Sequence, residues 1–483
     1  MAVGVPFGVS RLNLNCVHSF VQPLPWDFRR RFSLLESGSP SITPTAAATW
    51  TKELGLSVGR WSQRFCEIRR HLHQNPEPSG SETHTTRYIA SCLASQSLRP
   101  VIAPGGRGLW VDVGGQALAT EVSDGDDPAA KATQPDAAND SLDSDVASPC
   151  PWRLGIRGDI DGLWIGDEKA VDYRSTVDGV MHACGHDAHT TVVLGAVMVL
   201  REMEQAGKLP WPVACRAIFQ PAEESNRGAL EMIEAGAIDG LTHLIGLHVD
   251  PSRRVGTIGV RYGDFTADCH ELEIVIHGRG AHAARPHESI DPIAIAAQLI
   301  SSIYLFVPRS TDSQDPVVIT FGQIHGGLAA NVIPDQVIIR GTLRTQEAAI
   351  SSETIRHIER LARGLGDASG AKITVGWQSG PPPVKNDSAL VDLIATAGGS
   401  VLDEAHVQTI RRPSMGGEDF ANYLTRLRGA MFRLGCATDP IIAPPLHSPL
   451  FDIDERALAI GAEIFAQAVI RWSEPRHPNQ LFC

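Results

Sequence analysis

The chain has 483 residues, a formal net charge of −13 and a pI near 5.8, with 43% hydrophobic and 20% charged residues. This length exceeds what one ordinary hydrophobic core accommodates, so two or more domains are expected. The acidic balance argues against nucleic acid as a partner, because nucleic-acid binding rewards clustered Lys and Arg.

The sequence gives no sign of a membrane segment or a disulfide framework. No stretch approaches the apolar length needed to cross a bilayer, and residues 1–20 lack the features of a signal peptide, so no membrane partner is expected. Nine cysteines, an odd number, are scattered along the chain. These features predict a reducing, cytoplasmic location.

The first third of the chain contains two segments that we expect to be poorly ordered. Residues 1–45 mix Pro, Ser and Arg without periodicity and predict an N-terminal extension. Helical apolar spacing follows from Trp50 to about Ser95, and residues 106–115 predict a strand. Residues 117–148 are rich in Asp, Ala and Ser, which predicts a disordered acidic surface insertion rather than a recognition segment.

Strands and helices then alternate. Strands are predicted at 152–159, 213–220 and 242–249, with one helix that ends near Gln205 and another at 226–236. This alternation predicts an α/β domain whose sheet is mostly parallel and flanked by helices.

The pattern changes from about Asp264. Half-buried strands are predicted at 269–278, 316–324 and 336–345, interleaved with helices at 291–307 and 351–366. We expect an α+β domain at 264–374, inserted into a catalytic domain that comprises residues 46–263 and 375–475.

Polar clusters follow three of the predicted strands, and a fourth cluster follows a strand expected at 431–436 through a Pro-rich loop. Open α/β sheets bind ligands at the carboxyl ends of their strands, so these clusters predict a cation site. The clusters are Arg157–Asp161, Gln220–Glu224, His248–Asp250 and Leu446–Pro449.

The segment His182–His189 holds a thiol, three imidazoles and a carboxylate within eight residues. A single glycine separates Cys184 from His186, which lets both side chains turn toward one point. A cation together with a helix N-terminus would favour the thiolate that a metal needs. This density predicts a metal site rather than surface histidines and a buried cysteine.

The adjacent carboxylates of Glu223 and Glu224 can divide two roles. One binds a metal, while its neighbour takes a proton from a metal-bound water. Glu224, His248 and His447 together with the pair Cys184 and His186 give five candidate ligands. With one bridging group, five ligands suit two catalytic metals that keep positions open for water and substrate. Zinc, manganese, cobalt and nickel all remain candidates.

Nine motifs occur in an order that resembles the aminoacylase and hippurate hydrolase family of metallopeptidase-like amidohydrolases, which includes plant auxin-conjugate hydrolases. The resemblance covers about residues 50–475. The motifs are RGDIDG, MHACGHDAHT, FQPAEE, HVDP, GRGAHAARPH, NVIPD, GTLR, MGGEDF and LHSP. The resemblance implies a zinc-exopeptidase-like catalytic domain, an inserted lid or dimerisation domain, a small N-acyl amino acid substrate and a homodimer formed through the inserted domain.

The resemblance also implies the role of each metal-site residue. Cys184 would bridge two divalent cations, with Glu224 and His447 completing one, and His186 and His248 completing the other. Glu223 would be the general base that activates water between the cations, and Asp159 would be a supporting carboxylate.

Three further roles concern the substrate. His282 would stabilise the tetrahedral oxyanion, reaching the partner subunit's site in dimeric relatives. Asn331 and Arg344 would hold the substrate's carboxylate and carbonyl. Asn331 fits a plain turn before Ile333-Pro334 equally well.

The sequence therefore predicts metal-dependent hydrolysis of the amide bond of N-acyl amino acids. Departures from the family pattern at Leu163-Trp164-Ile165 and Gly417 leave the acyl group and amino acid open. Three alternatives remain. They are a dipeptidase or carboxypeptidase of the same chemistry, a metal-free hydrolase with Cys184 as nucleophile, and a non-catalytic binding protein that keeps the fold. The intact Glu223-Glu224 pair argues against the last.

Overall fold

The computed structural model describes residues 44–114 and 153–475. The expected N-terminal extension, residues 1–45, lies outside the described residues except for its last two positions. The acidic insertion expected at 117–148 lies entirely outside them.

A mixed sheet of eight strands forms the larger part of the described chain, in the order β1-β2-β4-β3-β5-β16-β6-β15. The pairs β3–β4, β3–β5, β5–β16 and β6–β15 are parallel, which confirms the predicted α/β class. The strands are β1 (Val101–Ile102), β2 (Leu109–Val113), β3 (Arg153–Asp159), β4 (Cys215–Gln220), β5 (Leu241–Arg254), β6 (Ile258–Val260), β15 (Val407–Thr409) and β16 (Arg428–Ala437).

Central strands of this sheet are buried on both faces. Six of the seven residues of β3 and all six of β4 are buried. Parallel strands that helices cover on both sides have continuous apolar runs, which is why the strands at 152–159 and 213–220 could be recognised in the sequence.

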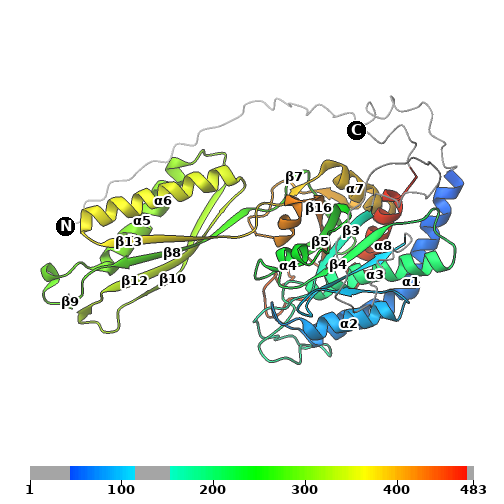
Figure 1. Ribbon diagram of the computed structural model, residues 1–483, viewed down its shortest axis with the longest axis horizontal. Coiled ribbons are helices and arrows are strands. Elements are labelled where there is room, and N and C mark those ends of the chain that lie inside the picture. The colour runs from blue at the N-terminus through cyan, green and yellow to red at the C-terminus, as the bar shows by residue number, and fades with distance from the viewer. Residues whose placement is uncertain (1–43, 115–152, 476–483) are drawn as a thin grey trace, which may run out of the picture. The chain divides into compact units, whose positions relative to one another are not determined.

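Helices cover both faces of the sheet. On one face, α1, α3 and α8 pack against one another, and α2 and α7 join the same core (Figure 1). On the other face, α4 and the short helix η4 pack on a second core. The helices are α1 (Pro44–Gln74), α2 (Thr83–Ala94), α3 (His186–Gln205), α4 (Gly228–Glu234), η4 (Asp419–Thr425), α7 (Ser388–Leu402) and α8 (Arg456–Trp472).

A second, fully antiparallel sheet has the order β10-β12-β8-β13 and a core of its own. Helices α5 (Pro292–Ser310) and α6 (Ala348–Ser369) pack on one of its faces. The strands are β8 (Asp268–His277), β10 (Val317–Gly326), β12 (Gln336–Thr345) and β13 (Lys372–Ser379). Because β13 pairs with β8 along its whole length, this small sheet extends past residue 374, the expected end of the inserted domain.

Short elements complete the described part of the chain. They are β7 (Gly263–Asp264) paired with β14 (Lys385–Asn386), β9 (Ala281–His282) paired with β11 (Val332–Ile333), η2 (Pro286–Glu288) and η3 (Glu404–His406).

Among the described helices, α5 alone is long and apolar enough to cross a membrane by length and composition. The expectation that no stretch of the chain approaches that length is therefore wrong for this helix. One face of α5, with Ile295, Leu299 and Ile303, is buried in the core of the small sheet. A core helix passes the same compositional test, so α5 is weak evidence for a membrane span.

Candidate metal centre

The carboxyl ends of three adjacent parallel strands carry the candidate ligands. Strands β4 and β5 lie on opposite sides of β3, so the chain reverses its direction of travel across the sheet at β3. Such a reversal opens a crevice at the carboxyl edge, where ligands bind. Asp159 ends β3, Glu223 and Glu224 follow β4, and His248 lies in β5.

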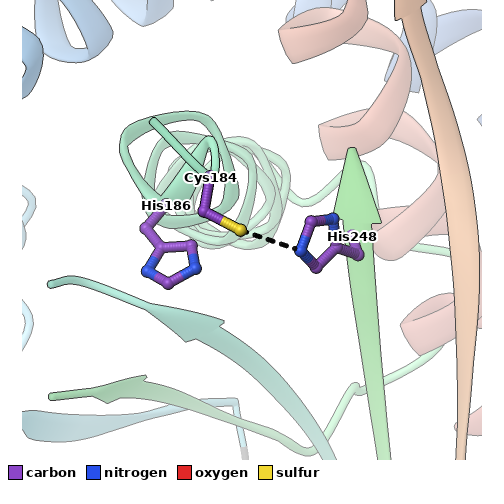
Figure 2. A group of neighbouring side chains, drawn as sticks. All are labelled: Cys184, His186 and His248. Atoms are coloured by element: carbon purple, nitrogen blue, oxygen red, sulfur yellow. Dashed lines mark hydrogen bonds between the residues drawn. The ribbon is translucent and has the colours of Figure 1, made fainter. Parts of the chain in front are cut away.

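The turn before α3 supplies Cys184 and His186. Gly185 between them is the N-cap of α3 and has φ +88°, and a Cβ there would lie 2.4 Å from Cγ2 of Val249. Glycine is therefore required for both conformation and space. Figure 2 shows the Cys184 sulfur pointing at His248, with a distance of 3.3 Å from Sγ to Nε2. Nδ1 of His248 donates to the carbonyl of Val249 at 2.7 Å, which leaves Nε2 for the site.

Glu224 and His447 join the cluster from the other side. Oε1 of Glu224 lies 3.3 Å from Nε2 of His447 and 3.8 Å from Nε2 of His186. His447 has φ +63°, a region that is strained for non-glycine residues and that recurs at functional sites. Its N–H donates to the carbonyl of Ala183 at 2.9 Å, so its loop is tied to the turn that carries Cys184.

These donors fit a pair of divalent metals. Two groups of donors share Cys184, one with His186 and His248 and the other with Glu224 and His447, and within each group the atoms lie within 4.8 Å of one another. Two buried donor atoms, Nε2 of His186 and Oε1 of Glu224, have no hydrogen-bond partner within the described residues. Buried polar atoms are rarely left without one, and thiolate, imidazole and carboxylate together suit a transition metal.

Burial and neighbouring charges shift the pKa values of the cluster's side chains. Burial raises the pKa of the Cys184 thiol well above its usual range, and Glu224 adds to the effect. Burial, with Glu418 and Asp419 nearby, also raises the pKa of Glu223. Burial alone would lower the pKa of His186, but the carboxylate of Asp159 and the hydrogen bond to Asp161 raise it. Bound cations favour the thiolate, the carboxylates and neutral imidazole instead.

Asp161 supports two of the candidate ligands at once. Its Oδ1 accepts from Nδ1 of His186 at 3.0 Å, and its Oδ2 accepts from the N–H of Glu224 at 3.0 Å and the hydroxyl of Ser79 at 2.6 Å. A carboxylate that holds the far nitrogen of a ligating histidine fixes the orientation of the ring. The sequence places Asp161 in the same cluster as Asp159 but gives it no role.

Asp159 lies beside the cluster with other partners. It accepts from Nη1 of Arg157 at 2.5 Å and from Nδ1 of His189 at 2.7 Å, and its Oδ2 is 3.9 Å from Nε2 of His186. His189 in turn accepts at Nε2 from the N–H of Val249 at 2.9 Å. Asp159 therefore acts on the cluster mainly indirectly, through His189, which links α3 to β5.

The remaining members of the His182–His189 run hold the local fold. Nδ1 of His182 donates to the carbonyl of Asp161 at 3.0 Å. Asp187 accepts from Nε of Arg69 at 2.9 Å and from Nδ1 of His73 at 2.6 Å, all three side chains being buried. The run thus divides into two residues at the cluster and others that fix its position against α1.

Glu223 is held by the segment Glu418–Asp419 of the MGGEDF motif. The N–H of Asp419 donates to Oε1 of Glu223 at 3.4 Å. Asp419 itself accepts from Arg157 at 2.9 Å and from Gln220 at 2.8 and 2.9 Å. The ends of β3 and β4 are thereby tied to η4 directly behind Glu223, an arrangement that the motif alone did not reveal.

A cavity of about 710 Å³ opens beside the cluster. Its wall includes all of the candidate ligands except His186, and residues of the small sheet such as Arg344. Arg344 donates through Nη1 to the carbonyl of Met415 at 2.9 Å. His282 and Asn331 are exposed and do not line this cavity, and the carbonyl of Asn331 accepts from the N–H of Ala283 at 3.0 Å.

Comparison with known proteins gives a consistent family. The sequence profile described as Peptidase family M20/M25/M40 matches residues 155–471. "Probable hydrolase sll0100" of Synechocystis sp. is 40% identical over 406 residues, which cover 84% of this chain and 94% of the relative. N-acetyl-L-cysteine deacetylase of Bacillus subtilis is 36% identical over 431 residues, or 88% of this chain and 92% of the relative. The crystal structure of the Bacillus subtilis YXEP protein, a dinuclear metal binding peptidase from the M20 family, matches with a TM-score of 0.67 and 30% identity over 86% of this chain and 99% of that chain.

Proposed function

Because this chain belongs to peptidase family M20/M25/M40 and is a hydrolase of carbon–nitrogen amide bonds, we propose that it releases the acyl group of N-acyl amino acids. The observation that carries the proposal is the cluster around Cys184, with a further carboxylate, Glu223, on the same cavity wall. A relative named N-acetyl-L-cysteine deacetylase supports this substrate class.

We assign the five donors to two divalent cations. Cys184 would serve both cations, Glu224 and His447 would hold one, and His186 and His248 would hold the other; each of these two groups of donors lies close together around Cys184. Such cations, when bound, would supply Lewis-acid chemistry, which polarises the amide carbonyl and acidifies the attacking water. Zinc, manganese, cobalt and nickel are all compatible with this mixture of donors.

Glu223 takes the proton of the attacking water and later delivers it to the nitrogen of the leaving amino acid. The N–H of Asp419 steadies one of its oxygens at 3.4 Å, and the side chain lines the cavity. Burial and the neighbouring Glu418 and Asp419 raise its pKa, which makes the carboxylate a better proton acceptor. Glu224 is next in sequence but is committed to His447 and His186.

Substrate positioning falls to residues of the small sheet. We assign Arg344, which the carbonyl of Met415 holds at the cavity wall, to the carboxylate of the substrate. We further propose a homodimer in which the partner subunit's His282 meets the oxyanion. Two observations favour it: His282 is exposed, and α5 exposes Tyr304, Leu305 and Phe306 by 45%, 59% and 45%.

A substrate panel tests the proposed function. Metal-loaded protein is incubated with acetyl-, benzoyl- and indoleacetyl-amino acids and, in parallel, with free dipeptides, and the released amino acid is quantified. Release from the acylated compounds is expected. Cleavage of dipeptides alone would favour a dipeptidase or carboxypeptidase, and activity that survives a chelator would favour Cys184 as nucleophile. No release from any compound would favour a binding protein.

A further inference from the structure

Arg433 is a cationic side chain in the cavity wall, and no described residue supplies it with a counter-ion. It lies in β16 directly opposite His248 of β5 in the parallel register, and it lines the cavity. Its guanidinium carbon is 5.2 Å from the centre of the Phe265 ring, a packing contact that holds it in place. Within residues 44–114 and 153–475, no hydrogen bond or ion pair of the Arg433 side chain is found, although its backbone pairs in the sheet.

The two carboxylates that raise the pKa of Arg433, Asp250 and Glu418, are engaged elsewhere. Asp250 accepts from Nε of Arg253 at 3.0 Å and from the hydroxyl of Ser252 at 2.5 Å. Glu418 lies 3.2 Å from Nη2 of Arg157 and accepts from the N–H of Phe420 at 3.1 Å. Burial lowers the pKa of Arg433, and Asp250 and Glu418 offset this only from a distance. A partly desolvated guanidinium without a partner is costly, so the site is built for an anion that arrives from the cavity.

A second arginine in the same cavity comes from the other sheet. Arg344 of β12 is tied to Met415, whereas Arg433 of β16 has all of its donors available. Every N-acyl amino acid carries one carboxylate. If Arg344 binds this carboxylate, Arg433 needs a different anionic group as its ligand. A planar guanidinium with five donors matches a carboxylate, whose two oxygens accept in parallel.

We propose that Arg433 binds a second carboxylate of the substrate, so that the preferred N-acyl amino acids are dianionic. This inference rests on the proposed function. The second carboxylate belongs either to an acidic amino-acid side chain or to a dicarboxylic acyl group. Both sources present the same chemistry to Arg433.

Matched pairs of probes isolate this carboxylate. N-acetyl-L-glutamate and N-acetyl-L-glutamine differ only in the side-chain carboxylate, and N-succinylglycine and N-succinamoylglycine differ only in the terminal acyl carboxylate. Dissociation constants are measured by calorimetry in full-length, metal-loaded Glu223→Gln protein, in which hydrolysis is slowed. We expect the acid of one pair to bind about 10- to 100-fold more tightly than its amide. The pair that shows the preference identifies the source of the carboxylate.

Arginine variants in the same background assign the effect. Arg433→Gln should abolish the preference and leave binding of the amide unchanged. Arg344→Gln should weaken both members of a pair equally, and Arg227→Gln, which removes an exposed arginine of the same cavity, should keep the preference. Metal content measured on each variant separates a lost carboxylate contact from a disturbed His248.

Three outcomes overturn the inference. The first is equal binding of acid and amide in both pairs, the second is an equal loss for acid and amide in Arg433→Gln, and the third is loss of the preference in Arg227→Gln. Each is distinct from failure of the proposed function. A protein that hydrolyses N-acyl amino acids without preferring the acids disproves only the role of Arg433. A protein that prefers the acids but hydrolyses nothing disproves only the proposed activity.

Discussion

Replacing Asp161 by Asn should weaken metal binding while the fold is retained. The carboxylate accepts from Nδ1 of His186 through one oxygen and from the N–H of Glu224 and the hydroxyl of Ser79 through the other. An asparagine keeps one accepting oxygen, but its NH₂ group cannot accept from Glu224 or Ser79. Two candidate ligands therefore lose part of their alignment in a single substitution.

The expected size of the effect follows from the role of such carboxylates. Removing a group that orients a metal ligand typically costs about 10- to 100-fold in metal affinity, or about 1.4–2.7 kcal/mol. The backbone carbonyl of Asp161 also lies 3.0 Å from Nδ1 of His186 and survives the substitution, which favours the lower end of this range. Affinity is measured by competition with a chelator of known metal affinity, and thermal unfolding of the metal-free protein reports on the fold.

Asp159→Asn is the matched comparison. Asp159 is fully buried against Arg157 and His189, so its loss should lower the free energy of unfolding by about 3 kcal/mol, with a smaller effect on metal affinity. The reasoning is refuted if Asp161→Asn binds metal as tightly as the unsubstituted protein while Asp159→Asn does not. That result would return the supporting role to Asp159, as the family resemblance implies.

Three further predictions concern the base, the metals and the framework. Glu223→Gln should keep its metal content but lose about 10²- to 10⁴-fold in kcat, and an unchanged kcat would exclude Glu223 as the base. Exhaustive chelation should abolish hydrolysis, which added Mn²⁺ or Zn²⁺ restores; activity without metal would contradict the cluster's role. Arg69→Met should lower the free energy of unfolding by about 3–5 kcal/mol at neutral pH, because Asp187 stays buried without its guanidinium. Burial raises the pKa of Asp187, but Arg69 and His73 lower it below its ordinary value, so the difference between the two proteins should shrink as the pH falls below about 4. Denaturant titrations of metal-free protein between pH 3 and 7 measure this, and a pH-independent difference would contradict it.

The ligand-bearing strand ends could be predicted from sequence because parallel strands converge at one edge of a sheet. Apolar runs that lead into Asp159, Glu223 and His248 identified them without knowledge of the strand order. The choice between Asp159 and Asp161 could not be made in this way. The strand ends at Asp159, and beyond it the alternation of side chains no longer tells which way residue 161 points.

Residues whose function depends on contacts between distant segments could not be identified from the sequence. The pairing of Asp419 with Gln220 joins segments 199 positions apart, and no local pattern indicates it. Arg433 did leave a signal, since it is a charged residue within the otherwise apolar strand MFRLGC. A charge in a buried strand demands a partner, and a search of the sequence for such charges would have found it.

The charges of the cavity link substrate binding to metal binding. The cavity wall contains four acidic and three basic side chains, which are Glu223, Glu224, Glu271 and Glu418, and Arg227, Arg344 and Arg433. Without cations, a substrate carboxylate would therefore approach a surface with more acidic than basic groups, close to the Cys184 thiol and the Glu223 carboxyl, whose pKa values burial raises. Two divalent cations reverse this balance. Because coupling between two ligands is reciprocal, an anionic substrate must also tighten the binding of the cations, and a dianionic one must do so more strongly.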